Sequence, residues 1–194
     1  MTYTLRLATP NDAASILAIY SPIVETSTIS FEFVPPTLKE MQQRIAHLLP
    51  RLPWLVCEAE QIVLGYAYAS PHRVRAAYQW SVDVSAYVHP QAHQRGVGRA
   101  LYTALFKILA LQGYYNVYAG ITQPNPASVG FHEALGFEFL CIYRQVGFKM
   151  GAWRDVGWWE LPLQEQVTPP QPPLDLAAAM AHPEWEAALT VGLR

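Results

Sequence analysis

The stretch Ser81-Val-Asp-Val-Ser-Ala-Tyr-Val88 alternates between polar and apolar side chains, and the glycine-containing stretch Arg95-Gly-Val-Gly-Arg-Ala100 follows it closely. A period of two predicts a strand that presents the valines on one face and Ser81, Asp83, Ser85 and Tyr87 on the other. Apolar residues then recur at helical spacing between Leu101 and Leu109, and Gly113 is suited to end a helix. We therefore expect a strand, a glycine turn and a helix in succession.

Strand and helix patterns also alternate on both sides of this unit. Upstream we expect strands over 3–7, 54–58 and 62–69 and helices over 13–20 and 38–48, the second opened by the capping-box pattern Thr37-Leu-Lys-Glu40. Downstream we expect strands over 115–121, 137–146 and 157–163, with a helix opened by Asn125-Pro126 and ended by Gly136. Such alternation predicts an α/β protein with a mixed sheet flanked by helices.

The Pro-rich stretch Thr168-Pro-Pro-Gln-Pro-Pro173 interrupts this pattern. Pro-rich segments are extended spacers, so we expect one domain over residues 1–165 and a linker with a short tail over 166–194. A short Ala-rich helix is expected within 175–189.

Composition excludes several classes of protein. Charged residues make up 14% and the net charge is -2, which argues against disorder and against a chain-wide nucleic-acid-binding surface. No apolar run approaches the roughly 20 residues that span a bilayer, and the N-terminal stretch does not resemble a secretory signal. Two cysteines form no disulfide scaffold, and no Cys/His cluster has zinc-ligand spacing. We expect a cytoplasmic protein without metal, nucleic-acid or membrane partners.

Charge is distributed unevenly along the chain. Between Glu60 and Glu133 the only carboxylate is Asp83, against five basic residues, which are Arg73, Arg75, Arg95, Arg99 and Lys107. A glycine turn flanked by arginines at a helix start is suited to phosphate groups. A plain strand-to-helix connection is the alternative interpretation. A dinucleotide fold fits poorly because a third glycine and a downstream acidic residue are missing, and no Gly-Lys-Ser/Thr motif indicates a P-loop.

The stretch His93-Gln-Arg-Gly-Val-Gly-Arg-Ala100 resembles the pyrophosphate-binding turn of the GNAT acetyltransferases, and Asn125-x-x-Ser128-x-x-Phe131-His-Glu133-x-x-Gly136 resembles a later motif of that superfamily. Further blocks such as Glu25-Thr-Ser-Thr28 and Trp153-Arg-Asp-Val-Gly157 are similar to its phosphinothricin (methionine sulfoximine) N-acetyltransferases. The resemblance runs from about Leu5 to Leu163. It implies a single GNAT domain with a mixed, mostly antiparallel central sheet, and a homodimer.

The resemblance also implies an activity. Acetyl-CoA and the α-amine of a small amino acid, such as phosphinothricin or methionine sulfoximine, would meet in a ternary complex, and the amine would attack the thioester directly. The residues implied to hold acetyl-CoA are Tyr87 and Val88 through their backbone, the turn formed by Arg95, Gly96, Val97, Gly98 and Arg99, and Asn125 with Ser128.

Two catalytic residues are implied. Asp83 stands where the resembling enzymes have a Glu that accepts the amine's proton, and because Asp is one methylene shorter, a relay through water is an alternative to direct contact. A structural pair between Asp83 and an arginine is the other interpretation. His132 stands where a Tyr often protonates the departing thiolate. It is equally interpreted as a structural histidine.

The acceptor site is implied at Arg73, Arg75, Tyr78, Ser85 and Phe31. A guanidinium suits a carboxylate or phosphinate, and a tyrosine hydroxyl adds a donor. Solvated loop arginines and a core Phe31 are the alternatives. Two other functions also remain open, namely an acetyltransferase for peptide or protein amines and a CoA-binding sensor without turnover.

Overall fold

The computed structural model describes residues 2–193, which fold around one seven-stranded sheet. Only the pair β4–β5 is parallel, and every other neighbouring pair is antiparallel. The expected mixed, mostly antiparallel sheet is therefore confirmed. In sheet order the strands are β1 (Thr4–Leu7), β2 (Trp54–Ala59), β3 (Ile62–Pro71), β4 (Ser81–Val88), β5 (Asn116–Thr122), β7 (Ala152–Pro162) and β6 (Glu138–Lys149).

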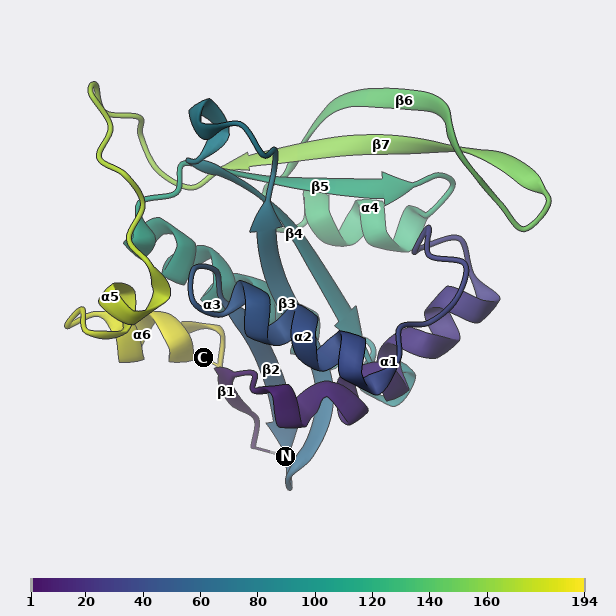
Figure 1. Cartoon of the computed structure of the whole chain (residues 1–194), viewed down its shortest axis with the longest axis horizontal. Coiled ribbons are helices and arrows are strands. Elements are labelled where there is room, and N and C mark those ends of the chain that lie inside the picture. Colours follow the sequence, from purple (N-terminus) through teal and green to yellow (C-terminus); the bar gives the residue numbers. More distant parts are fainter. Residues whose placement is uncertain (1, 194) are drawn as a thin grey trace.

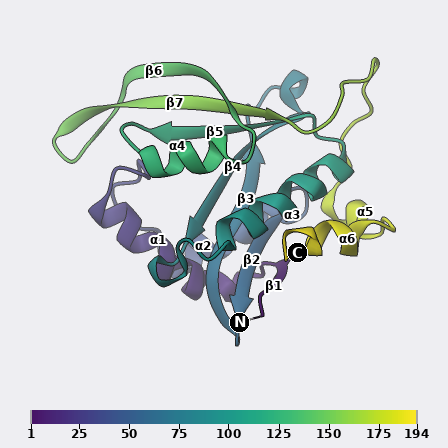
Figure 2. The same ribbon diagram turned by 180° about the vertical axis from the view of Figure 1, so that it is seen from behind.

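Helices cover both faces of this sheet (Figure 1). The helices α1 (Ala13–Thr26) and α2 (Leu38–Leu48) pack on one face, and α3 (Val97–Gln112) and α4 (Pro126–Glu133) lie on the other, as the reverse view shows (Figure 2). Each face has its own buried apolar cluster, one centred on α3 and the other between α1, α2 and the strands β2 and β3. No described helix is long and apolar enough to cross a membrane.

The strands β4 and β5 stay together for only three residues. Ser81, Val82 and Asp83 pair with Asn116, Val117 and Tyr118, and the remainder of β4 pairs with β3 alone. The remainder of β5 pairs with β7 alone. The sheet therefore splits beyond Asp83, and the backbone of β4 from Val84 to Val88 lacks a strand partner on that side.

The tail beyond Glu165 differs from the expected separate segment. Two short helices, α5 (Leu176–Met180) and α6 (Trp185–Thr190), replace the single expected helix. Leu176, Ala179 and Trp185 are buried in the cluster around α3. The Pro-rich connection is largely exposed, as a spacer should be, but the apolar side chains after it contribute to the main core.

Candidate active site

A narrow cavity of about 60 Å³ occupies the split between β4 and β5. The strand residues from Val84 to Tyr87 form one wall and Ala119 to Thr122 form the other. Asn125, Ser128 and His132 of α4 line it as well, so the structure brings these three expected residues to the same place as Ser85 and Tyr87. Ile29 and Tyr102 complete the lining and were not expected from the sequence.

The glycine turn leads into the N-terminus of α3. Gly96 caps this helix with a φ of +82°, a left-handed conformation that favours glycine. The first N–H with a partner inside the helix is that of Ala100, which donates to the Gly96 carbonyl at 2.9 Å. The N–H groups of Val97, Gly98 and Arg99 therefore lie at the positive end of the helix dipole without intrahelical acceptors.

The surroundings of the turn leave room for an anion. A Cβ at Gly96 would meet no atom within 4 Å, whereas one at Gly98 would lie 3.2 Å from the Phe131 ring of α4. Arg95 and Arg99 are exposed on either side of the turn. Three amides without intrahelical acceptors, two arginines and open space around Gly96 suit an anionic group such as a phosphate.

Asp83 lies at the point where the sheet splits, on the face that α1 and α2 cover. Its Oδ1 is 2.6 Å from Nδ1 of His72, so Asp83 has a histidine partner instead of the arginine considered above. Burial raises the pKa of Asp83, while the hydrogen bond with His72 opposes that shift. The carboxyl group thus has one oriented partner in a partly dehydrated site.

His132 is buried in α4 and faces Tyr102 of α3. Its Nδ1 lies 2.8 Å from the Ser128 carbonyl oxygen, which only accepts, so Nδ1 carries a proton. In the neutral ring, Nε2 then accepts from the Tyr102 hydroxyl at 3.3 Å. Burial lowers the pKa of His132, although the bond to Ser128 opposes this effect. The neutral tautomer is therefore favoured near pH 7.

The expected acceptor residues gather around the short helix η2 (Ala76–Tyr78) and its approach. Arg73 lies over the Trp158 ring at 5.8 Å and donates to the His72 carbonyl. Arg75 is exposed, and its guanidinium bonds to no group within residues 2–193. Tyr78 is 44% exposed beside His72. The guanidinium of Arg75 and the hydroxyl of Tyr78 are thus available as donors to an anionic ligand.

Phe31 belongs to the loop between α1 and α2 and lies against the β6–β7 hairpin. A Cβ at Gly147 of β6 would overlap the Phe31 ring, so glycine is required there for this contact. Lys149, at the end of β6, reaches the same loop: its Nζ donates to the carbonyls of Val24 and Ser30 at 2.7 Å each. The hairpin therefore holds the loop that carries Ile29 and Phe31.

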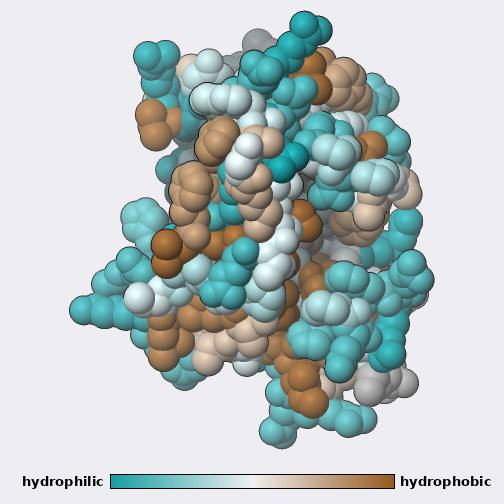
Figure 3. All heavy atoms as spheres, turned by 90° about the vertical axis from the view of Figure 1, so that its right-hand side faces the viewer, coloured by the Kyte–Doolittle hydropathy of each residue, from teal (hydrophilic) through white to brown (hydrophobic). Residues whose placement is uncertain are grey.

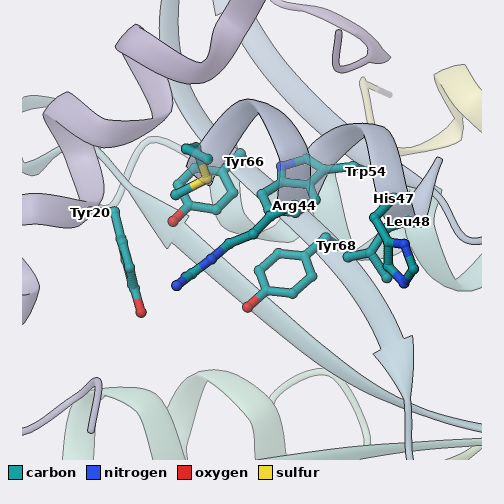
Figure 4. A pocket seen from close by; sticks show the side chains of 8 residues that line it. Tyr20, Arg44, His47, Leu48, Trp54, Tyr66 and Tyr68 are labelled. Carbon is teal, nitrogen blue, oxygen red and sulfur yellow. The ribbon is translucent and has the colours of Figure 1, made fainter. Parts of the chain in front are cut away.

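A second cavity, of about 170 Å³, lies between α2 and the aromatic residues of β2 and β3. Trp54 stacks on Tyr68 with ring centroids 4.3 Å apart, and the polar ends of Tyr20, Arg44 and Tyr68 point to one side of this stack (Figure 4). Arg44 forms an ion pair with Glu32, and the shorter of their two hydrogen bonds measures 2.6 Å. This cavity adjoins the α1 face of β4 through the edge contact between Tyr20 and Tyr87.

Several residues of the site had a weak signal or none in the sequence. His72 lies in the turn-like stretch Ser70-Pro-His-Arg73, where nothing indicated its pairing with Asp83. Trp158 carries a buried indole N–H without an acceptor among residues 2–193 and touches His72 edge-on, yet a Trp in a strand ordinarily indicates core packing. Within the described chain no cluster of three His, Cys, Asp or Glu side chains has the arrangement of a metal site.

Comparisons with known proteins agree with this geometry. Residues 5–158 match the family model described as the acetyltransferase (GNAT) domain. The chain is 41% identical over 168 residues to a phosphinothricin N-acetyltransferase of Streptomyces viridochromogenes, covering 87% of this chain and 91% of that protein. It is 33% identical over 167 residues to the L-methionine sulfoximine/L-methionine sulfone acetyltransferase of Salmonella typhimurium, covering 86% and 98% of the two chains.

Solved structures include a similar protein with a bound acyl donor. A GNAT superfamily phosphinothricin acetyltransferase from Sinorhizobium meliloti, crystallised in complex with AcCoA, superposes with a TM-score of 0.81 at 35% identity. The superposition covers 89% of this chain and 97% of that one.

Proposed function

Because the chain belongs to the GNAT acetyltransferase family, we propose that it transfers an acetyl group from acetyl-CoA to the α-amine of a small amino acid or analogue of the phosphinothricin and methionine sulfoximine type. One observation carries the proposal. The pairing of β4 with β5 ends at the half-buried Asp83 carboxyl group, and the split beyond it holds the cavity lined by Asn125, Ser128 and His132.

The donor site is proposed at the turn and in the split. Acetyl-CoA supplies a thioester whose carbonyl carbon accepts the amine. Arg95, Arg99 and the N–H groups at the start of α3 hold its diphosphate, while Tyr87 and Val88 offer backbone groups to its pantetheine arm. Asn125 caps α4 by accepting from the Ser128 N–H at 3.1 Å, and both residues are proposed to contact the same arm.

The amine must lose a proton before it attacks, because an α-ammonium group is mostly protonated at pH 7. Asp83 is the last residue of β4 that pairs with β5, so its carboxyl group lies where the split begins, and it is proposed to serve the base function. Ser85 lies two residues further along β4 and therefore on the same face. It is proposed to contact the acceptor between Asp83 and the thioester.

The leaving thiolate needs a proton in return. The Tyr102 hydroxyl donates to Nε2 of His132 inside the cavity, and both side chains line the split. We assign His132 to this step, acting with Tyr102, because the Tyr102 hydroxyl that faces the neutral His132 ring is the proton donor of this pair in the cavity lining.

The acceptor's acid group is proposed to bind Arg75 and Tyr78, with Arg73 close by. A planar guanidinium bonds a carboxylate or phosphinate in bidentate fashion, and Arg75 has no competing partner within residues 2–193. Phe31 provides an apolar wall for the side chain. A free α-carboxylate is the group that would distinguish an amino acid from the N-terminus of a peptide.

A homodimer and a cytoplasmic location complete the proposal. The edge strand β6 exposes large apolar side chains on both faces, namely Phe139, Leu140, Ile142, Tyr143, Val146 and Phe148. Apolar clusters are visible on the side of the molecule that carries the far end of the β6–β7 hairpin (Figure 3). A second copy is suited to cover such an edge.

Cys57 and Cys141 are free thiols, as expected in a reducing compartment.

The test is a thiol-release assay with acetyl-CoA across free amino acids, methionine sulfoximine and phosphinothricin, each compared with its α-carboxamide. We expect release of CoA and an N-acetylated product by mass spectrometry for acceptors with a free carboxylate. Arg75→Ala should raise the KM of these acceptors about 10- to 100-fold, in line with a lost charge-assisted hydrogen bond, and should leave the carboxamides unaffected.

Two results would contradict the proposal. Equal activity on carboxamides or peptides would indicate a peptide acetyltransferase. Binding of acetyl-CoA in calorimetry, without release of CoA for any amine, would indicate a CoA-binding sensor.

A further inference from the structure

His72 follows directly after β3, and its imidazole is held in one orientation by its neighbours. Its Nδ1 lies 2.6 Å from Asp83 Oδ1. The ring stacks on Tyr118 of β5 with centroids 4.4 Å apart, and the rings of Tyr78 and Trp158 meet it edge-on at 6.2 and 6.0 Å. These contacts on several sides of the imidazole hold the ring in one orientation.

The second ring nitrogen is free. Because the Asp83 carboxylate accepts from Nδ1, the neutral imidazole keeps a lone pair on Nε2. Nε2 has no hydrogen-bond partner within residues 2–193. This atom is not fully buried, so solvent or a ligand reaches it. The His72 side chain is 14% exposed, against 28% for Asp83.

We propose that His72, oriented by Asp83, is the group that takes the proton from the acceptor's ammonium nitrogen. This inference rests on the proposed function and specifies its base. Asp83 is short and its Oδ1 is already bonded to His72, whereas the ring extends the dyad beyond the carboxylate by the width of an imidazole. A carboxylate on Nδ1 also stabilises the imidazolium that forms.

Atoms and charges balance as follows. The ammonium proton moves to Nε2 of His72, and the amine lone pair forms a bond to the thioester carbonyl carbon. The carbon–sulfur bond breaks with its electron pair on sulfur, which takes a proton from the Tyr102–His132 side. His72 returns this proton to solvent and then takes the second proton, which the bonded nitrogen loses as the amide forms. The Tyr102–His132 pair recovers from solvent the proton that it gave to sulfur.

The groups around His72 set its response to pH. Asp83 faces it from β4, and Arg73 follows it on its own segment. The phenols of Tyr78 and Tyr118 face it from η2 and β5, and Trp158 faces it from β7 without charge.

The test compares His72→Phe, Asp83→Asn and the wild type in steady-state kinetics between pH 5 and 9. Phe retains a ring to stack on Tyr118 but removes both nitrogens. We expect kcat to fall at least about 100-fold in His72→Phe, the usual contribution of a general base, with the KM of acetyl-CoA unchanged. The acidic limb of the wild-type kcat/KM profile should disappear. The control His182→Phe, on the exposed tail, should match the wild type.

A double variant separates a lost base from a damaged site. His72→Phe/Asp83→Glu lengthens the carboxylate by one methylene in the space of the ring. We expect it to recover part of the activity, with an acidic limb shifted toward the pKa of a carboxyl group.

The inference would be overturned if His72→Phe kept the wild-type kcat and acidic limb, or if Asp83→Asn had unchanged kinetics. An active wild type would leave the proposed function intact in either case. An inactive wild type would instead overturn the proposed function. If His72→Phe does not fold, ¹⁵N-histidine NMR of the wild type decides: the His72 signal must titrate within this pH range and respond to the acceptor, and a His72 that does neither overturns the inference.

Discussion

Lys149 at the end of β6 donates from Nζ to the Ser30 carbonyl at 2.7 Å and to the Val24 carbonyl at the same distance. Its side chain is 4% exposed, and no carboxylate within residues 2–193 forms an ion pair with it. The ammonium group therefore serves to tie the end of α1 and the following loop to the hairpin. That loop carries Ile29 and Phe31, one in the lining of the sheet split and the other proposed to line the acceptor pocket.

Lys149→Met should destabilise the protein and loosen this loop. Methionine has a similar length but no donor, so two buried carbonyls lose their partner at a cost of about 2–4 kcal/mol in the free energy of unfolding. We also expect a higher KM for the acceptor and little change for acetyl-CoA. Urea unfolding and kinetics measure both. Lys107→Met, at an exposed position of α3, is the matched control and should change stability by less than about 0.5 kcal/mol.

The two glycines that cap α3 provide a comparison between strain and ligand binding. Gly96 and Gly113 both have left-handed φ values, +82° and +93°. Alanine at either position should cost about 1 kcal/mol of stability. Only Gly96→Ala should also raise the KM of acetyl-CoA, because Gly96 opens the proposed diphosphate site whereas Gly113 ends the helix beside Pro173. An equal rise of the KM of acetyl-CoA in both variants would show that the turn is not part of the donor site.

The sequence predicted the parts of the site that depend on local pattern. Alternation from Ser81 to Val88 placed Asp83 and Ser85 on one face, and the spacing of Gly96 and Gly98 predicted the start of α3. The structure agrees because strand period and helix caps depend on neighbouring residues. His132 was found through its motif, but its partner Tyr102 lies 30 residues away on another helix.

Contacts between distant segments were not predictable in the same way. Asp83 meets His72 only because β3 and β4 pair in one register, with Ser70 opposite Asp83. Lys149 reaches Ser30 across more than a hundred residues. The tail was misjudged for a related reason: the composition of 168–173 indicates an extended spacer, but it carries no information on where the apolar residues after it pack.

Trp185→Ala tests whether the tail contributes to the core. Trp185 is buried against the cluster around α3, so its truncation should cost about 3–5 kcal/mol in the free energy of unfolding. Met180→Ala on the same tail, where the side chain is exposed, should cost less than about 1 kcal/mol. Chemical unfolding followed by tryptophan fluorescence and circular dichroism measures both. Equal, small losses would mean that the tail detaches in solution.

His132 predicts a particular dependence of stability on pH. Burial holds its pKa below the usual value of about 6.5, so the unfolded chain binds this proton at a higher pH than the folded chain does. The stability that neutral His132 contributes is then complete above the unfolded-state pKa and is lost as pH falls through the folded-state pKa. The difference in unfolding free energy between wild type and His132→Gln should shrink from pH 7.5 to pH 5. A constant difference would contradict this assignment.

The exposed edge strand β6 is the surface at which the proposed homodimer would form. Phe139 and Ile142 are 57% and 41% exposed, and charge placed on such an edge opposes pairing with a second copy. Ile142→Asp should therefore halve the mass measured by light scattering at micromolar concentration. The control Ile62→Asp alters an equally apolar exposed side chain at the start of β3, far along the sheet from β6, and should leave the mass unchanged. A wild type that has the mass of one chain, or an Ile142→Asp variant that remains dimeric, would show that β6 is not the interface.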